Sequence, residues 1–249
     1  GEDIDLRIFF MHWAFAFAVS EMARGKERLS LQFFAEDGMA VHKIYLTPQS
    51  NINAYHALVE KYKAEEQSAE LAIKAFSEEK NYKTDAEVAI ENFQKSWLDL
   101  KDTHHFFGLL KKHNISRTQA LRLAPSTYHA AKIEKEKIVS MLEGVARKEV
   151  PIMVFVGNRG NIQIHTGEIK KTLWHQQWFN IMDPDFNLHL NMEKLKNCWI
   201  VRKPTEDGIV TSIECFDEND ELIVQFFGKR KPGIPEIKEW QEVIAQLQQ

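Results

Sequence analysis

The chain has few of the residues that mark disulfide-rich and metal-binding proteins. Only two of its 249 residues are cysteines, Cys198 and Cys215, and their spacing fits neither a disulfide framework nor a zinc site. We therefore expect both to be buried on strands as small hydrophobic residues, in a protein of the reducing cytoplasm. The ten histidines include no HExxH pair, so the chain lacks the motif of a zinc protease.

Positive charge and long apolar runs are also scarce. The 32 Lys and Arg residues are outnumbered by 36 Asp and Glu residues, a balance that argues against a general nucleic-acid binder. The longest apolar run, residues 8–19, is interrupted by His12 and is shorter than the roughly 20 residues that cross a bilayer. It also lacks the cleavage site of a signal peptide. We expect no nucleic-acid partner and no stable membrane insertion.

The hydrophobic content of 44% is enough for one large domain or two small ones. Within residues 8–19, bulky residues alternate with Ala14, Ala16 and Ala18, which predicts a strand with one nearly bare face. A helix packed over these alanines explains the pattern equally well. Further periodicity predicts strands at 28–34 and 40–46 and helices at 51–63 and 235–247.

The two ends of the chain resemble each other at an offset of 182 residues. This offset pairs identical residues at several positions, among them Val19 with Val201 and Ser30 with Ser212. It also sets one predicted order of strands and a helix over another. We infer an internal repeat, although alternating strands produce such identities by chance as well.

Between the repeats, residues 64–91 are rich in Glu, Lys and Ala and contain neither Gly nor Pro. This composition predicts an exposed helical connector with a solvated charged face.

Residues 102–117 combine an imidazole, a pair of phenylalanines and a downstream arginine. Asp102 is a candidate N-cap, which would put His104 in the first turn of a helix, where the helix dipole favours a neutral ring that can bind a metal. Phe106, Phe107, Leu109 and Leu110 predict an apolar face. Taken alone, such a histidine is more often a core or surface residue than a ligand.

A second helix is predicted directly after this segment. Ser116 and Gln119 have the spacing of a capping box, and the helix that they open carries Arg117.

A family resemblance changes the interpretation of these residues. Eight blocks, in order along the chain, resemble the bacterial hemin-degrading factor family (HemS, ChuS and HmuS type): DLR at 5–7, GKERLSLQFF at 25–34, HFFGLLKKHNISR at 105–117, MVFVGNRG at 153–160, IQIHTG at 162–167, DPDFNLHL at 183–190, WIVRKPTEDGIVTS at 199–212 and QFFGKRKPG at 225–233. They cover nearly the whole chain apart from its charged middle.

The resemblance implies an α+β fold of two tandem repeats, each a large antiparallel sheet with packed helices. Because the family's first repeat begins before the segment that matches Gly1, we expect the first repeat to be incomplete here. The predicted organisation is residues 1–65 for the end of the first repeat, 66–95 for the charged helical connector and 96–249 for the second repeat, with the haem-ligand helix at its start.

The resemblance also implies a haem b site between the two repeats. The position of His104 matches the axial ligand of the haem iron, and His105 is the alternative. Arg7 matches an arginine on the opposite haem face, where it is the one candidate catalytic residue.

Four further residues match positions that meet the propionates or line the pocket, which suits a ligand with two carboxylates: Arg117, Lys203, Gln225 and Arg230. Phe227 lines the same pocket but departs from the tyrosine of many relatives. The lost hydroxyl would cost about 1.5 to 3 kcal/mol if nothing replaced it.

Two functions share this implied site. The first is a cytoplasmic haem carrier that receives haem from an inner-membrane transporter and passes it to a haem oxygenase. The second is an enzyme that opens the porphyrin and releases iron, and the sequence does not decide between them, although the shortage of proton-delivering residues favours the carrier. A third interpretation is an interaction protein whose haem site has decayed. A homodimer is also compatible with the family.

Overall fold

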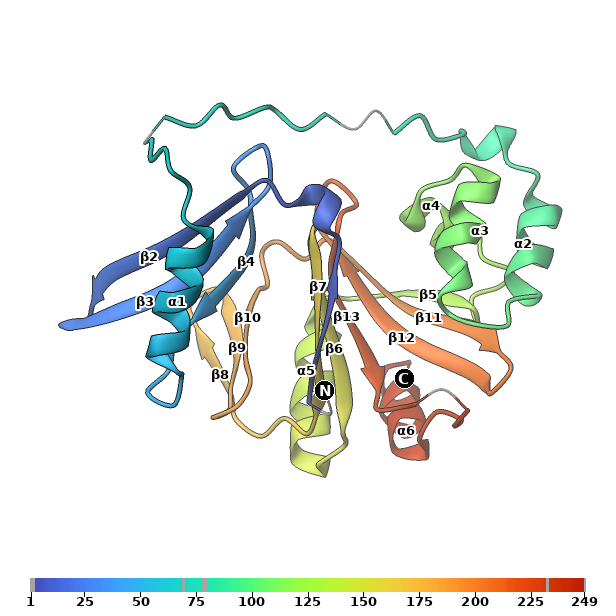
Figure 1. Ribbon diagram of the computed structural model, residues 1–249. Helices are drawn as coiled ribbons and strands as arrows, with labels where there is room; N and C mark the ends of the chain where they lie inside the picture. Colours follow the sequence, from blue (N-terminus) through green and yellow to red (C-terminus); the bar gives the residue numbers. More distant parts are fainter. Residues whose placement is uncertain (1–2, 69, 78–79, 232, 249) are drawn as a thin grey trace. The chain divides into compact units, whose positions relative to one another are not determined.

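The computed structural model describes residues 3–68, 70–77, 80–231 and 233–248 (Figure 1). The strands are β1 (Ile4–Ile8), β2 (Phe15–Ala23), β3 (Lys26–Phe34), β4 (Ala40–Tyr45), β5 (Ala130–Ile133), β6 (Ile152–Gly157), β7 (Asn161–Gly167), β8 (Thr172–His175), β9 (Trp178–Met182), β10 (Asn187–Asn191), β11 (Asn197–Thr205), β12 (Gly208–Phe216) and β13 (Leu222–Gly228). The helices are α1 (Ile52–Tyr62), α2 (Ile90–Leu98), α3 (His105–His113), α4 (Arg117–Arg122), α5 (Glu136–Lys148) and α6 (Lys238–Leu247), with 3-10 turns η1 (Phe10–His12) and η2 (Asp85–Glu87). None of these helices is both long and apolar enough to span a membrane.

The strands form one large and two small sheets. The large sheet has seven strands in the order β1-β7-β6-β13-β12-β11-β5, and the small sheets are β10-β9-β8 and β2-β3-β4. Neighbouring strands pair antiparallel from β6 through β13, β12 and β11 to β5, and in both small sheets. The α+β class and the large antiparallel sheet are therefore confirmed.

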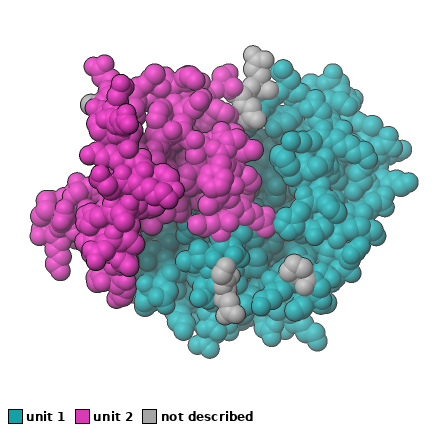
Figure 2. All heavy atoms as spheres, in the orientation of Figure 1, with its two compact units in different colours: residues 1–5, 80–157, 163–249 teal, residues 6–79, 158–162 magenta. Residues whose placement is uncertain are grey.

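The chain divides into two compact units (Figure 2). Unit 1 comprises residues 1–5, 80–157 and 163–249, and unit 2 comprises residues 6–79 and 158–162. The boundary at 80 lies within the predicted connector, so residues 80–95 belong to the same unit as the second repeat.

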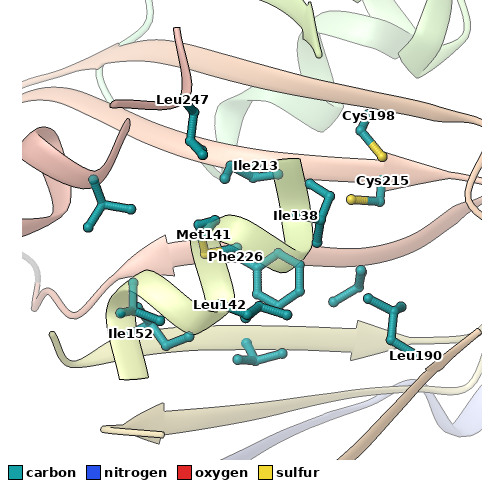
Figure 3. Close-up of a cluster of buried hydrophobic side chains, with 14 of the residues drawn as sticks. Ile138, Met141, Leu142, Ile152, Leu190, Cys198, Ile213, Cys215, Phe226 and Leu247 are labelled. Carbon is teal, nitrogen blue, oxygen red and sulfur yellow. The ribbon is translucent and has the colours of Figure 1, made fainter. Parts of the chain in front are cut away.

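The main core of unit 1 lies between helices α5 and α6 and one face of the large sheet (Figure 3). Ile138 and Leu142 on α5 are fully buried, as are Ile213 on β12 and Phe226 on β13. Each such side chain stabilises the fold by roughly 1.5 to 3 kcal/mol through the apolar area that it removes from water. Cys198 and Cys215 are buried free thiols on strands, as predicted, and they face each other across β11 and β12 in this core.

The opposite face of the same sheet packs against helices α2, α3 and α4. Phe93, Trp97 and Phe106 from these helices meet Val201 on β11 and Phe216 on β12 in a second buried cluster. Successive strand residues point to opposite faces, which explains why Ile200 belongs to the first cluster and Val201 to the second.

The internal repeat is visible in the bounds of the strands. β2 and β11 both contain nine residues and begin at Phe15 and Asn197, 182 residues apart. β3 and β12 are offset by the same number, and so are the starts of β4 and β13. Even the irregularity in pairing recurs, between Phe33 and Phe34 in β3 and between Cys215 and Phe216 in β12. A helix follows each trio of strands, so the predicted repeat is confirmed.

The predicted helical conformation of the connector is wrong up to Thr84, whereas residues 90–95 at its end belong to α2. The described residues between Lys63 and Thr84 contain neither helix nor strand, and all of them are exposed. A helix without a buried apolar face gains too little from propensity alone to offset its loss of chain entropy, which explains the difference.

The prediction for residues 8–19 is correct only in part. The strand β2 begins at Phe15, and the turn η1 separates it from β1. The cause is a tertiary contact, because the backbone N–H of Phe9 and the indole Nε1 of Trp13 both donate to the carbonyl of Gly160, at 2.9 and 2.7 Å. Gly160 has no room for a side chain, since a Cβ there would lie 2.5 Å from Val41.

Candidate functional site

His104 lies at the N-terminal end of α3. The helix begins at His105, so His104 occupies the N-cap position and not the first turn that its sequence context predicts. Its side chain is 61% exposed. The carboxylate Oδ1 of Asp102 accepts the backbone N–H of His104 at 2.7 Å and lies 2.6 Å from Nδ1 of the imidazole.

This pair of contacts fixes the ring. A proton on Nδ1 donates to Asp102, which leaves the lone pair on Nε2 for a metal, the arrangement that supports most metal-binding histidines. The pKa of Asp102 is lowered because its carboxylate accepts the backbone N–H and then the ring of His104, against an opposing effect of burial. Asp102 is not the N-cap that the sequence predicts, and its contact with the ring was not predicted.

The residues after His104 divide between a buried and an exposed face of α3. Phe106 is buried, but Phe107 is 63% exposed. The ammonium group of Lys111 lies 4.7 Å from the centre of the Phe107 ring. The prediction that both phenylalanines share one apolar face is therefore wrong. Helical spacing sets Phe107, Gly108 and Lys111 on the side of α3 that begins at His104, so a partly apolar strip adjoins the imidazole.

The segment after α3 folds as predicted. The Ser116 hydroxyl accepts the backbone N–H of Gln119, and the Gln119 side chain accepts that of Ser116, so a capping box opens α4. Arg117 in its first turn points to β12, where Nε and Nη2 donate to the two oxygens of Glu214 at 2.6 and 2.8 Å.

Glu214 also binds Lys203. Nζ of Lys203 on β11 donates to Oε1 of Glu214 at 2.7 Å, and Ser212 adds a hydrogen bond of 3.0 Å to the same oxygen. Both Lys203 and Arg117 approach the ring of Phe106, at 4.5 and 5.2 Å from its centre. The structure thus brings two of the predicted site residues together on a carboxylate that is fully buried.

Burial and charge compete in this cluster. Burial lowers the pKa of Lys203 to about 8, although the Glu214 carboxylate opposes the shift. Burial alone would raise the pKa of Glu214, but the charges of Arg117 and Lys203 outweigh it and hold that pKa well below its usual range. Glu214 was missed in the sequence, where the available signal is a carboxylate between Ile213 and Cys215 on a buried strand.

Gln225 and Phe227 extend this face of the sheet. Gln225 pairs with Glu214 and Phe227 with Ser212 across β12 and β13, and both side chains are half-buried. The Phe227 ring lies 4.9 Å from that of Phe155, so the surface beside the charged cluster is aromatic.

Two predicted residues remain, Arg230 and Arg7. Nη2 of Arg230 donates to Asp207 at 3.3 Å, while its buried Nε has no hydrogen-bond partner in the described structure. Arg7 is exposed on β1 and belongs to unit 2. The roles of all these residues toward haem stay predictions.

Comparison with known proteins identifies the family. Residues 1–62 and 114–247 match the model of the haemin-degrading HemS/ChuX domain. The chain belongs to this family. Its matched ranges leave out residues 63–113, which include His104.

Members of the HemS/ChuX family with known structures or functions are similar over almost the whole chain. The hemin transport protein HemS of Yersinia enterocolitica is 38% identical over 98% of this chain and 70% of its own length. Holo-PhuS, a haem-binding protein from Pseudomonas aeruginosa, is 44% identical with a TM-score of 0.96 and covers 99% of this chain and 71% of its own. The Escherichia coli haem oxygenase ChuS is 36% identical with a TM-score of 0.87, over 99% of this chain and 72% of its own.

A smaller protein in this group bears on the repeat. ChuX matches 64% of this chain with 96% of its own length, at a TM-score of 0.53 and 16% identity. At that identity the likeness concerns the fold alone. It indicates that a half-size version of the fold exists as a separate protein, as the tandem repeat implies.

Proposed function

We propose that this chain binds haem b through Nε2 of His104 and acts as a haem carrier. The observation that carries the proposal is the Asp102–His104 pair, in which a carboxylate 2.6 Å from Nδ1 orients the imidazole beside an exposed aromatic side chain. The similarity to hemin transport proteins and to a haem-binding protein supports it.

The residues around His104 suit a porphyrin. Phe107 offers an exposed ring for stacking, and Gly108 has no atom within 4 Å of the place where a side chain would begin, so a flat ligand can approach the helix. The described residues contain no group of three or more His, Cys, Asp or Glu that could hold a free metal ion. A single imidazole is sufficient for an iron that a porphyrin already holds.

The charged and polar residues on the sheet would orient the ligand. Arg117, Lys203 and Gln225 supply donors for propionates on the face that adjoins Phe227, and Arg230 adds a guanidinium with an unused Nε. Arg7 is proposed for the opposite haem face on the strength of the family resemblance. When bound, haem supplies a redox-active iron.

A carrier must also give haem away. We propose that the protein acts in the cytoplasm, receives haem from an inner-membrane transporter and delivers it to a haem oxygenase. One imidazole ligand with an exposed ring is compatible with ready exchange, because few protein groups must be displaced.

Haem degradation is the second candidate function. It is favoured by the similarity to ChuS, which is described as a haem-degrading enzyme and a haem oxygenase. In that case Arg7 would be the catalytic residue. The test is to incubate the haem complex with an electron donor and catalase. Loss of the haem absorbance that persists with catalase would support the enzyme, and absence of this loss would support the carrier.

A hemin titration followed by absorbance tests the proposed site. We expect a saturable one-to-one Soret band for the chain and for His105→Ala, and its loss in His104→Ala. His105 is the matched control because it is adjacent to His104 and is also exposed. Loss of the band in His105→Ala alone would move the ligand to the neighbouring residue. Absence of saturable binding in a folded sample would refute the proposed function.

A further inference from the structure

The carboxylate of Glu214 sits where a ligand carboxylate would be expected. It is completely buried and accepts three side-chain hydrogen bonds from cations, two from Arg117 and one from Lys203. These two cations are the ones proposed to meet the haem propionates. In the described structure their charge is thus already partly neutralised from within the protein.

The fold itself does not require a carboxylate at this place. The offset of 182 residues sets Gln32 of β3 against Glu214 of β12, and Ser30 against Ser212. Gln32 is also buried and bonds to Ser30 at 3.0 Å, the same distance that separates Ser212 from Glu214. A neutral amide therefore satisfies the equivalent position of the first repeat.

The difference between the repeats lies in the neighbouring cations. Lys203 corresponds by the same offset to Glu21, whose ion pair with Arg28 is exposed. In the second repeat, α4 delivers the guanidinium of Arg117 to Glu214 on the central strand. The negative charge of Glu214 is thus matched to the cations and not to the strand.

We propose that Glu214 is an internal counter-ion that competes with the ligand's propionates for Arg117 and Lys203, and so holds haem affinity down and release fast. This inference rests on the proposed haem-binding function. Arg117 is the residue through which the competition would act, because a quarter of its side chain is exposed whereas Lys203 is 3% exposed. Removal of the carboxylate would leave two desolvated cations that a ligand carboxylate can compensate.

The test compares hemin with hemin dimethyl ester, which has the same iron and ring but no propionate charge. We expect Glu214→Gln to increase the preference for hemin over the ester about tenfold, the scale of one hydrogen bond to a charged group. Transfer of hemin to excess apomyoglobin should slow by a similar factor while transfer of the ester stays unchanged. Glu206→Gln, an exposed carboxylate just after β11, is the control for a change in net charge alone.

A second pair of variants covers the case in which Glu214→Gln fails to fold. Lys203→Met and Lys203→Met/Glu214→Gln differ only at position 214, and neither buries two uncompensated cations. The double variant should prefer hemin over the ester about tenfold more strongly than Lys203→Met does.

A purely structural role for Glu214 predicts a different result. In that case the affinities for hemin and for the ester would change equally, and this outcome, or a reduced preference for hemin, would overturn the inference. If the unmodified chain binds hemin saturably but the variants leave the preference unchanged, haem binding stands and the counter-ion does not. If it binds no hemin, the proposed function fails first.

Discussion

Strands β2 to β4 and strands β11 to β13 start at equivalent positions and pair in the same register, yet they differ in how many of their residues are buried. In β12 seven consecutive residues are buried, whereas β3 buries two. Helix α6 buries Trp240, Val243, Ile244 and Leu247, and α1 buries none. The local pattern of residues sets the strands, while elements encoded elsewhere in the chain, such as α5 and β6, determine what becomes core.

The largest expected effect contrasts equivalent positions of the two closing helices. The offset sets Leu58, 43% exposed, against Trp240, which is fully buried and donates to the carbonyl of Thr211 at 3.0 Å. We expect Trp240→Ala to reduce the free energy of unfolding by about 3 to 5 kcal/mol. Leu58→Ala should cost about 0.5 kcal/mol or less. Urea unfolding measures both, and similar losses would show that the exposed helix is packed in solution.

The second prediction contrasts Glu214 with Gln32 in acid. The folded-state pKa of Glu214 lies below its ordinary value, so its ion pairs stabilise the protein above about pH 4.5 and this contribution is lost as the pH falls. At neutral pH, Glu214→Gln should reduce the free energy of unfolding by about 3 to 5 kcal/mol relative to the unmodified chain.

The pH dependence isolates this one group. The difference in free energy of unfolding between the unmodified chain and Glu214→Gln should decrease as the pH falls below about 4.5. The reason is that the carboxylate becomes neutral first in the unfolded chain. Gln32→Leu serves as the control. It changes no ionisable group, so its difference in free energy of unfolding from the unmodified chain should be independent of pH. A constant difference for Glu214→Gln would contradict the role of charge. Denaturant midpoints measured across the acid range provide the data.

The third prediction uses a site that lies outside the repeated strands. Asp102→Asn removes the charge that holds Nδ1 of His104, and we expect about a 10- to 100-fold loss of hemin affinity with little change in unfolding. Asp99→Asn, an exposed acid at the end of α2, is the matched control. Equal hemin binding by both variants would mean that Asp102 acts only on the backbone of the turn.

The smallest effect is expected from a pair of aromatic residues on the last strands. Phe227 of β13 corresponds by the offset to Tyr45 of β4, so the first repeat carries the hydroxyl that the second lacks. Phe227→Tyr should raise hemin affinity by up to about tenfold, through one added hydrogen bond to a charged group. Tyr45→Phe should leave it unchanged. The hemin titration reports both, and a weaker binding of Phe227→Tyr would place the hydroxyl away from the propionates.

Much of the fold could be predicted because it follows from short-range patterns. Alternating residues predicted β3 and β4, an amphipathic stripe predicted α6, and Ser116 with Gln119 predicted the start of α4. The contacts that broke the pattern are long-range. The hydrogen bond from Trp13 to the carbonyl of Gly160 keeps Trp13 outside the strand in which it was predicted. The charged connector is exposed and has no surface on which a helix could pack.

The site was predictable only as a set of residue types. Family resemblance selected His104, Arg117 and Lys203, but periodicity could not reveal that Glu214 lies between the two cations. That contact joins residues 97 positions apart in the chain. Spacing likewise could not show whether Asp102 would bond to the backbone of His104, to its ring, or to both.

The facing thiols in the main core can report chemically on the separation of strands β11 and β12. Cys198 and Cys215 are the only cysteines in the chain, and they are 1% and 0% exposed. Burial also raises the pKa of the Cys215 thiol, so the reactive thiolate is scarce in the folded state. Alkylation should therefore proceed only as fast as strands β11 and β12 separate, which makes the labelling rate of this haem-handling chain a measure of unfolding that requires no added probe.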